Sequence, residues 1–560
     1  MRIHAIRRLG NALAAGLPLA LALGCAGSGG DAPVKVEPKH IILFIGDGMQ
    51  LEHEIAASRY LTGTDRGLVW QGFPTQAQVC TWDVSTYDRY ALASGAANYT
   101  DQGFLPRLGY DETRGGALPC PDQPTPDPGY FLTPLRKSAA DSLPYAPATD
   151  SASAGTAMAC GYKTDDGNIA WLPKDPKTGG NRANDGSLLT IAELFRQHRG
   201  GGIGVVSTVP FNHATPASFV AHNVSRNNYY TGRSGYTGLG IADEIIHHTR
   251  PEVVIGGGHP QLDNPSYNTS KGYLSKPLHD HLRTSQEWVF AERQTGVDGS
   301  QTLAQAAERA VREKKRLFGL FGGPGGNFEP PVPAHTPGAP SLQRGSLENP
   351  LLKDAAVAAL QVLSQNPKGF FLMVEQGDID WANHANDYRW MIGTMWDLDQ
   401  AIRATLDYID HPGDTLTREN TLILVTSDHG NSYMRHNPAK PLGHGELPQQ
   451  VPTAPLKGRL VWDDRRETLV IQRGDGSLER LAYASPWSYP GGEITYGTGD
   501  HTNELVTLAV QGTPSDHALV KAEQRSWYRF GNVLDNTQIF RVLRDASGLP
   551  SVGALPTPKP

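Results

Sequence analysis

The sequence predicts an α/β protein in which helices cover both faces of a mainly parallel central sheet, a three-layer sandwich. Short runs of β-branched and aromatic residues recur along the chain, and they are predicted to be strands. Segments whose apolar residues have helical spacing separate these runs. Apolar strands that alternate with amphipathic helices are typical of such a sheet.

The predicted elements follow one another in a regular order. Seven runs are expected to form strands, namely 40–45, 202–207, 252–255, 316–321, 370–374, 421–427 and 505–510. Helices are expected at 187–198, 354–365 and 388–410. The first of these helices has Leu188, Ile191, Leu194 and Phe195 on one face, and we expect Ser187 to cap it. Parallel sheets of this type bind ligands at the carboxyl ends of their strands.

Composition indicates a globular protein with large surface insertions. The 560 residues are 39% hydrophobic and 19% charged, which allows one large core or two domains. We predict one α/β domain over 39–547, with insertions at about 84–147, 325–350 and 437–498 and a Pro-rich tail at 548–560. Residues 467–481 carry a β-hairpin signal. A net charge of -7 without basic runs argues against a nucleic-acid partner.

The N-terminus resembles an export signal. Arg2, Arg7 and Arg8 precede an apolar stretch at 12–23 that is too short to span a bilayer, so residues 1–24 are predicted to be a signal and 25–38 a flexible linker. The residues around Cys25 resemble a lipoprotein cleavage site, which predicts a lipid anchor there. Ordinary signal cleavage and twin-arginine export are the alternatives. The expected location is periplasmic or anchored in the outer membrane, with the cell surface or secretion also open.

The remaining cysteines allow at most one disulfide. Cys80 with Cys120 is the favoured pair, because Cys160 lies in a run of small residues that is typical of a packed helix end. Three buried free thiols are the alternative.

Metal-binding side chains stand where the predicted strands end. Asp47, Glu375 and the pair Asp428-His429 each follow an apolar run. A single aspartate in this position usually caps a helix. Several carboxylates that converge on one sheet edge are costly to bury unless cations compensate them. This placement therefore predicts a metal centre.

Asp380 and His384 are four residues apart, so on a helix they would share one face and could bind one ion. Nitrogen with oxygen ligands suits zinc, whereas an all-oxygen set suits magnesium. Ser151 is the candidate nucleophile, because Asp150 and Ser151 open a run of small residues with helical character. A hydroxyl at a helix N-terminus faces backbone N–H groups that favour phosphate. The alternative is that Asp150 or Ser151 is only a helix cap.

Six ordered blocks between residues 40 and 510 resemble the motifs of the alkaline phosphatase family. They are Asp47-Gly48-Met49, Thr149-Asp150-Ser151-Ala152, the segment 214–226, Glu375 with Asp380 and His384, Ser427-Asp428-His429-Gly430, and His501-Thr502. The resemblance implies the fold of that family and hydrolysis of small phosphate monoesters through a phosphoserine intermediate. It also implies a homodimer as a possible assembly.

The resemblance further implies two zinc ions and one magnesium ion per chain. Asp380, His384 and His501 would hold one zinc, and Asp47, Asp428 and His429 the other. Asp47, Thr215 and Glu375 would hold magnesium. Arg226 would grip the phosphate, with Asp150 holding the guanidinium in place. His501 follows from the resemblance alone, and His222, His436 and His444 are expected to be structural or surface residues.

Two positions depart from the family pattern. His213 stands where some members have aspartate near the magnesium and others have histidine, so magnesium binding is expected to be weaker there, or zinc to compete. Trp381 stands where other members have lysine or histidine, and it either removes a cationic group from the phosphate site or packs against a loop. The alternative functions are a phosphodiesterase of the wider superfamily and a non-catalytic lipoprotein that binds phosphate or metal.

Overall fold

The computed structural model divides the chain into two units, Met1–Lys35 and Val36–Pro560. The residues that it describes all lie in the second unit, and they are 38–99, 103–110, 148–175, 178–182, 186–260, 267, 272–411, 416–448, 458–463, 468–473, 477–480, 487–512, 527–528 and 533–552. The expected export signal, Cys25, the linker up to 37, Cys120 and most of the Pro-rich tail lie outside these residues. The predictions for them therefore stay predictions.

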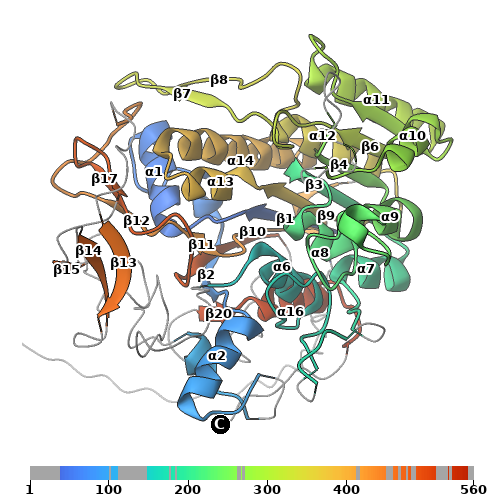
Figure 1. Cartoon of the computed structure of the whole chain (residues 1–560). Helices are drawn as coiled ribbons and strands as arrows, with labels where there is room; N and C mark the ends of the chain where they lie inside the picture. Colours follow the sequence, from blue (N-terminus) through green and yellow to red (C-terminus); the bar gives the residue numbers. More distant parts are fainter. Residues whose placement is uncertain are drawn as a thin grey trace, which may run out of the picture. The chain divides into compact units, whose positions relative to one another are not determined.

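A ten-stranded sheet forms the centre of the described chain (Figure 1). Its strand order is β20-β2-β19-β10-β1-β9-β3-β4-β6-β5. The strands are β1 His40–Gly46, β2 Thr75–Cys80, β3 Gly202–Pro210, β4 Val253–Gly257, β5 Trp288–Glu292, β6 Arg316–Leu320, β9 Phe370–Gln376, β10 Thr421–Thr426, β19 Val506–Gln511 and β20 Val533–Asp535. β19 is antiparallel to both of its neighbours, and all other pairs are parallel. The prediction of a mainly parallel sheet is confirmed, and all seven predicted strands belong to it.

The middle of the sheet is buried on both faces. β1 lies between β9 and β10, and every residue of these three strands is buried. Alternate side chains of β1 enter two separate cores, with Ile41 and Leu43 in one and Ile42 and Phe44 in the other. Each such side chain contributes about 1.5–3 kcal/mol through burial. This burial explains why these strands are continuous apolar runs.

Two groups of helices cover the opposite faces of the sheet (Figure 1), which confirms the three-layer architecture. One group contains α6 Ser151–Cys160, α7 Ile191–Arg199, α8 Ala214–Val220 and α16 Thr537–Ala546. The other contains α1 Leu51–Thr62, α11 Gly299–Glu313, α12 Leu352–Leu363, α13 Asp378–His384 and α14 Tyr388–Ile409. Further helices are α2 Val84–Ser94, α3 Pro106–Gly109, α9 Ile241–Glu244 and α10 Lys276–Thr284.

The predicted helices occur close to their expected positions, with one correction. The helix expected at 388–410 is α14, and Asp387 caps it with a bond from Trp390 N. The helix expected at 354–365 is α12. The proposed cap at Ser187 is wrong, because α7 begins after Thr190, whose side chain accepts from Glu193 N in a capping box. Ser187 instead forms an isolated β-bridge with Trp171.

Small sheets lie in or beside the expected insertions. β7 Val332–Ala334 and β8 Ser341–Gln343 form one, and β13 Gly458–Asp463, β14 Thr468–Arg473 and β15 Leu478–Arg480 form another. β14 and β15 pair antiparallel, as the hairpin signal predicts. The others are β11 Gly430–Asn431 with β18 His501–Thr502, and β12 Met434–His436 with β16 Trp487–Ser488 and β17 Ile494–Tyr496. Single turns of 3-10 helix occur at Val69–Gly72, Arg233–Gly235 and Arg418–Asn420, and of π-helix at Ile245–Thr249.

A buried ion pair anchors the far edge of the sheet. Lys163 Nζ lies 2.9 Å from Asp535 Oδ2, and both side chains are at most 1% exposed. The same ammonium donates to Trp82 O and to Asn536 Oδ1, each at 2.6 Å. These acceptors satisfy all three protons of the lysine, which allows the charge to be buried.

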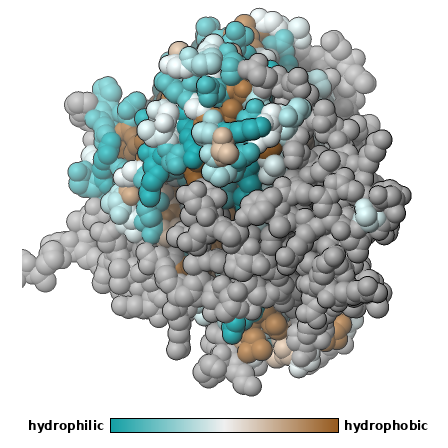
Figure 2. Space-filling model, turned by 90° about the vertical axis from the view of Figure 1, so that its left-hand side faces the viewer, coloured by the Kyte–Doolittle hydropathy of each residue, from teal (hydrophilic) through white to brown (hydrophobic). Residues whose placement is uncertain are grey.

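No helix among the described residues is long and apolar enough to cross a bilayer. On the face in Figure 2, hydrophilic residues cover most of the described surface, with small apolar areas between and below them. Cys160 ends α6 as a buried free thiol, as the small-residue run suggests, and Cys80 is buried on β2.

Candidate active site

Three carboxylates meet at the carboxyl edge of the sheet. Asp47 follows β1, Glu375 lies near the end of β9, and Asp428 follows β10. β1 pairs with both neighbours, and Ile45 lies opposite Glu375 on one side and Thr426 on the other. All three carboxylates are at most 1% exposed. The strand register therefore brings together groups that are far apart in the sequence.

A tight turn positions Asp47. Gly48 has φ +67°, and its N–H donates to Asp428 Oδ1 at 3.1 Å. A Cβ on Gly48 would lie 2.9 Å from the Cα of Asp380. Met49 N donates to Ser427 Oγ at 2.9 Å. The glycine therefore provides both the left-handed backbone and the space that the next element needs.

Asp380, His384 and His501 form the first group of metal-binding side chains. The segment Asp378–His384 is helical, so Asp380 and His384 share one face of α13. His384 Nδ1 lies 2.6 Å from Gly499 O, and His501 Nδ1 lies 2.7 Å from Thr149 O. Because a carbonyl oxygen only accepts, each Nδ1 carries a proton and each Nε2 faces inward.

The inward atoms of this group are close enough for one cation. The two Nε2 atoms are 3.2 Å apart, and they lie 3.2 and 3.4 Å from the two oxygens of Asp380. Although burial lowers the pKa of His384, the Asp380 carboxylate raises it to about 9. The Asp380 carboxylate therefore favours a positive charge at this position.

A second group surrounds His429. Its Nε2 lies 3.3 Å from Asp47 Oδ1 and 3.3 Å from Asp428 Oδ2. Those two carboxylate oxygens are buried and have no hydrogen-bond partner. Burial and the nearby carboxylates of Asp428, Asp380 and Glu375 raise the pKa of Asp47 well above its usual range. Acidic groups this crowded need a cation to stay ionised, so the residues present fit a metal.

A third group of oxygen atoms lies beside the second. Thr215 Oγ1 on α8 and Glu375 Oε1 are both buried without a hydrogen-bond partner. Ser207 donates to the other oxygen of Glu375. Burial raises the pKa of Glu375 to about 8. A hydroxyl and carboxylates are the ligands that magnesium prefers.

Ser151 is the first residue of α6, as the sequence predicts, and its Oγ lies 3.2 Å from His429 Nε2. Asp150 caps the helix by accepting from Ser153 N at 2.9 Å and from Ser153 Oγ at 2.7 Å. Its other oxygen binds Arg226 Nη1 at 2.9 Å. Burial raises the pKa of Asp150, but Arg226 and Ser153 outweigh it and hold this pKa at about 2. The serine thus lies beside the second group, and the guanidinium is tied to the residue that precedes the serine.

The alkaline phosphatase family model matches residues 120–471, more than half of the chain. The chain belongs to the alkaline phosphatase family. Alkaline phosphatase 4 of Bacillus subtilis (strain 168) is 31% identical over 281 residues, which cover 50% of this chain and 49% of that protein. Alkaline phosphatase of Escherichia coli (strain K12) is 30% identical over 306 residues, which cover 51% and 58%. The chain thus spans about half the length of the curated relatives it matches.

Solved structures of alkaline phosphatases share the fold. The Thermus thermophilus alkaline phosphatase superposes with a TM-score of 0.50 at 20% identity, covering 95% of this chain and 96% of that one. The cold-active alkaline phosphatase of Shewanella sp. gives the same TM-score and identity, covering 91% and 100%. These similarities confirm the predicted alkaline-phosphatase-like α/β fold.

His213 and Trp381 lie close together. The rings of His213 and Trp381 are 6.2 Å apart, and His213 stacks on Tyr229 with 6.5 Å between ring centres. Burial and the Arg226 guanidinium lower the pKa of His213 to about 3, so its imidazole is neutral. Its Nδ1 is buried without a hydrogen-bond partner. The Trp381 ring therefore lies beside a residue next to the third group.

Sequence reasoning missed several residues that position the alkaline phosphatase site. Asn431 donates to Asp380 Oδ1 at 2.6 Å, and Ser207 binds Glu375. Asn431 directly follows the Ser427-Asp428-His429-Gly430 block, and this position is the one feature of the sequence that could have pointed to it. Ser207 lies opposite Glu375 in the β3–β9 register, which the sequence does not reveal.

The other histidines near the motifs have structural contacts. His222 Nδ1 lies 2.7 Å from Glu244 Oε1, and its Nε2 lies 2.9 Å from Leu188 O and 3.3 Å from Glu193 Oε2. Both nitrogens face acceptors, so the doubly protonated ring fits best. His436 Nε2 lies 3.0 Å from Glu52 O in a buried position.

Proposed function

We propose that the protein hydrolyses phosphate monoesters to an alcohol and inorganic phosphate, with Ser151 as the nucleophile. The observation that supports this most strongly is the position of Ser151 Oγ, at the start of α6 and 3.2 Å from His429 Nε2. The N–H groups in the first turn of a helix have no partner within it, so they favour a bound phosphate. Membership of the alkaline phosphatase family supports the same reaction class.

The proposed cofactors are two zinc ions and one magnesium ion. One zinc would be held by Asp380, His384 and His501, and the other by Asp47, Asp428 and His429. Magnesium would be held by Asp47, Thr215 and Glu375, with His213 close by. When bound, these cations would supply Lewis-acid stabilisation of the serine and leaving-group oxygens and of the attacking water.

The reaction would proceed in two displacements at phosphorus. In the first, Ser151 Oγ gives up its proton and bonds to phosphorus, while the ester oxygen leaves with its electron pair and becomes the alcohol. In the second, water attacks the phosphoserine, Ser151 recovers a proton and phosphate departs. Two in-line displacements retain the configuration at phosphorus.

Arg226 is proposed to select the substrate charge. A planar guanidinium can bind two phosphate oxygens at once, which suits a dianionic monoester better than a singly charged diester. Its contact with Asp150 at 2.9 Å holds the guanidinium next to the nucleophile. The contacts of Ser153 with the other oxygen of Asp150 hold that carboxylate in place.

The cellular location, the assembly and the substrates of the protein are also proposals. An export signal at 1–24 with a lipid on Cys25 would place the enzyme in the periplasm, on the outer membrane or outside the cell. A homodimer is a further possibility that the family suggests. Small phosphate monoesters are the proposed substrates.

The deciding experiment compares hydrolysis of a chromogenic phosphate monoester and the matched diester by the purified protein across pH. The assay is repeated after chelation and after zinc and magnesium are restored. Monoester turnover that chelation abolishes and metals restore is the expected result. Preference for the diester would instead favour a superfamily phosphodiesterase, and metal binding without turnover would favour a non-catalytic protein.

The covalent step has its own test. The Ser151→Ala variant should lose monoester hydrolysis, and acid quenching of the wild type during turnover should trap phosphate on the peptide that contains Ser151. Full hydrolysis by Ser151→Ala would exclude the phosphoserine route. Ser218→Ala is the matched control, because its hydroxyl contacts only the backbone, Ala214 O at 2.8 Å and Ala152 O at 3.3 Å, and takes no proposed part in the chemistry.

A further inference from the structure

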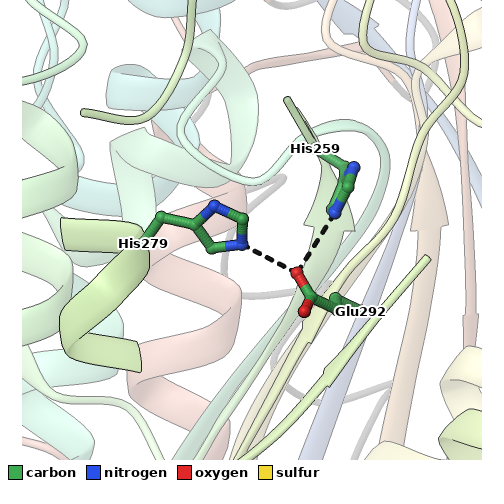
Figure 3. A group of neighbouring side chains, drawn as sticks. All are labelled: His259, His279 and Glu292. Carbon is green, nitrogen blue, oxygen red and sulfur yellow. Dashed lines mark hydrogen bonds and ion pairs between the residues drawn. The ribbon is translucent and has the colours of Figure 1, made fainter. Parts of the chain in front are cut away.

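Two histidines and a glutamate converge outside the catalytic groups, near the β5 edge of the sheet. Figure 3 shows their side chains. His259 follows β4, His279 lies on α10 and Glu292 ends β5. His279 Nε2 lies 2.7 Å from Glu292 Oε2, and His259 Nε2 lies 3.2 Å from the same oxygen. Both imidazole side chains are 1% exposed, and the glutamate is 17% exposed.

The chain builds this cluster from three separate elements. Gly258 has φ +96°, and its N–H donates to Gly326 O at 2.7 Å, which turns the chain sharply after β4. His259 N then donates to Phe321 O at 2.9 Å. Because β6 lies between β4 and β5 in the sheet, His259 reaches across the end of β6 to meet Glu292.

The arrangement of atoms suits one cation. A ligand atom from each of the three residues lies within 4.8 Å of the other two. The His259 and His279 rings are 5.6 Å apart and nearly perpendicular, so their nitrogens approach Glu292 from different directions (Figure 3). Tyr267 Oη contacts His279 Nδ1, and a hydroxyl there can accept the Nδ1 proton and leave Nε2 free to coordinate.

Charge compensation without metal is the competing explanation. Arg283 binds both oxygens of Glu292, at 2.9 and 3.0 Å. Burial raises the pKa of Glu292, but its contacts with His259, His279 and Arg283 hold it well below the usual range. A hydrogen-bonded hub needs only one donor nitrogen from each histidine. Another side chain that donates a hydrogen bond could therefore replace each histidine in such a network, whereas a metal site needs the imidazole nitrogens.

We propose that His259, His279 and Glu292 bind a divalent cation of the zinc type, at a site separate from the catalytic groups. Two imidazoles and one carboxylate are a ligand set that zinc accepts, with water completing the tetrahedron. The cation joins the loop after β4, helix α10 and the edge strand β5. Its role is to hold that edge of the sheet together.

The test measures zinc bound per chain by the full-length protein. Metal-stripped protein is equilibrated with buffered free zinc, and bound zinc is counted by mass spectrometry for the wild type, His279→Gln, His259→Gln and His281→Gln. Glutamine can still donate a hydrogen bond to Glu292 but offers no imidazole nitrogen. His281→Gln is the control, because His281 is an exposed histidine on the same helix.

The expected result is a loss of about one zinc per chain in His279→Gln and His259→Gln and no loss in His281→Gln. Equal zinc in all four proteins overturns the proposal and leaves a hydrogen-bonded hub. The result does not depend on the proposed function, because a protein without monoester turnover can still show the difference in zinc content.

A second measurement uses the wild type alone, so it still tests the proposal if the histidine variants fail to fold. Crystals of the zinc-loaded wild type are measured at the zinc absorption edge. The proposal expects an anomalous peak about 2.0–2.2 Å from His259, His279 and Glu292 atoms. Crystals that show zinc peaks at the catalytic groups but none at His259, His279 and Glu292 would also overturn the proposal.

Discussion

The Asp150→Asn variant tests whether Arg226 grips the substrate phosphate. Asparagine is as good a helix cap as aspartate, so the contact from Ser153 N at 2.9 Å should survive. The ion pair with Arg226 at 2.9 Å is lost, because the new amide cannot offer a negative charge. The guanidinium then loses the ion-pair partner that holds it beside the nucleophile.

The size of the effect follows from the strength of this contact. A hydrogen bond to a charged group contributes about 1.5–3 kcal/mol, which corresponds to about 10- to 150-fold in binding. The side chains of Arg226 and Asp150 are 21% and 14% exposed, so water weakens the pair and the lower end applies. We therefore expect KM for a monoester and the inhibition constant of phosphate to rise about tenfold, with a smaller change in kcat.

Steady-state hydrolysis with phosphate inhibition measures these constants, and zinc analysis shows that the metals are retained. Ser153→Ala is the matched control, since it removes the 2.7 Å contact of Ser153 Oγ with Asp150 but keeps the ion pair. If KM and phosphate inhibition stay at wild-type values in Asp150→Asn, the assigned role of Arg226 is wrong. The same conclusion holds if Ser153→Ala has an equally large effect.

Three further substitutions test the site and two ion-paired groups outside it. Gly48→Ala places a Cβ at φ +67° and 2.9 Å from the Cα of Asp380, which costs about 1–2 kcal/mol of stability. This variant should therefore have a lower zinc content and a lower kcat. Gly63→Ala is the control, because at φ +76° it strains the backbone away from the site and should lower neither quantity. Burial opposes protonation of His222, but its two glutamate partners raise its pKa to about 10, above the unfolded value of about 6.5. The stabilisation by the protonated His222 is therefore complete below pH of about 6.5 and is lost as pH rises towards 10. In urea unfolding, the difference in unfolding free energy between the wild type and His222→Gln should shrink over that range. A difference that stays constant with pH would contradict this. Lys163→Met leaves the Asp535 carboxylate buried without its ion-pair partner and should lower the unfolding free energy by about 3–5 kcal/mol. Adding Asp535→Asn should restore part of that loss. A loss below about 1 kcal/mol would show that water reaches the carboxylate.

The central strands were predictable because burial on both faces requires continuous apolar residues. β2, β5 and β20 were missed for different reasons. β2 reads Thr-Gln-Ala-Gln-Val-Cys and is only partly buried, which leaves little apolar pattern. β20 has three residues, and β5 has five at the edge of the sheet. Short or edge strands depend on their neighbours more than on their own sequence.

The error at the start of α7 has a local cause. Ser187 and Thr190 are both good caps, and the apolar residues after Ser187 made it the earlier choice. Glu193 stands three residues after Thr190 and completes the capping box there. The reciprocal contacts of Thr190 and Glu193 satisfy two backbone donors, while Ser187 has no acidic partner at that spacing.

The candidate site was predictable where the fold itself brings residues together. The carboxyl ends of parallel strands share one edge, so Asp47, Glu375 and Asp428 could be placed near one another from sequence. His501 could not, because its position depends on the pairing of β18 with β11, in which it lies opposite Asn431. Seventy residues separate the two positions, and no spacing rule connects them.

The same reasoning explains why the His259 cluster has no sequence signature. Asp380 and His384 share one helix, so their spacing alone identifies a possible pair of ligands. His259, His279 and Glu292 each come from a different element, and the sharp turn at Gly258 decides whether the first reaches the others. A metal site is visible in a sequence only when at least two ligands share a regular element or end neighbouring strands. His259 and Glu292 fail this condition, since β6 separates the strands that carry them.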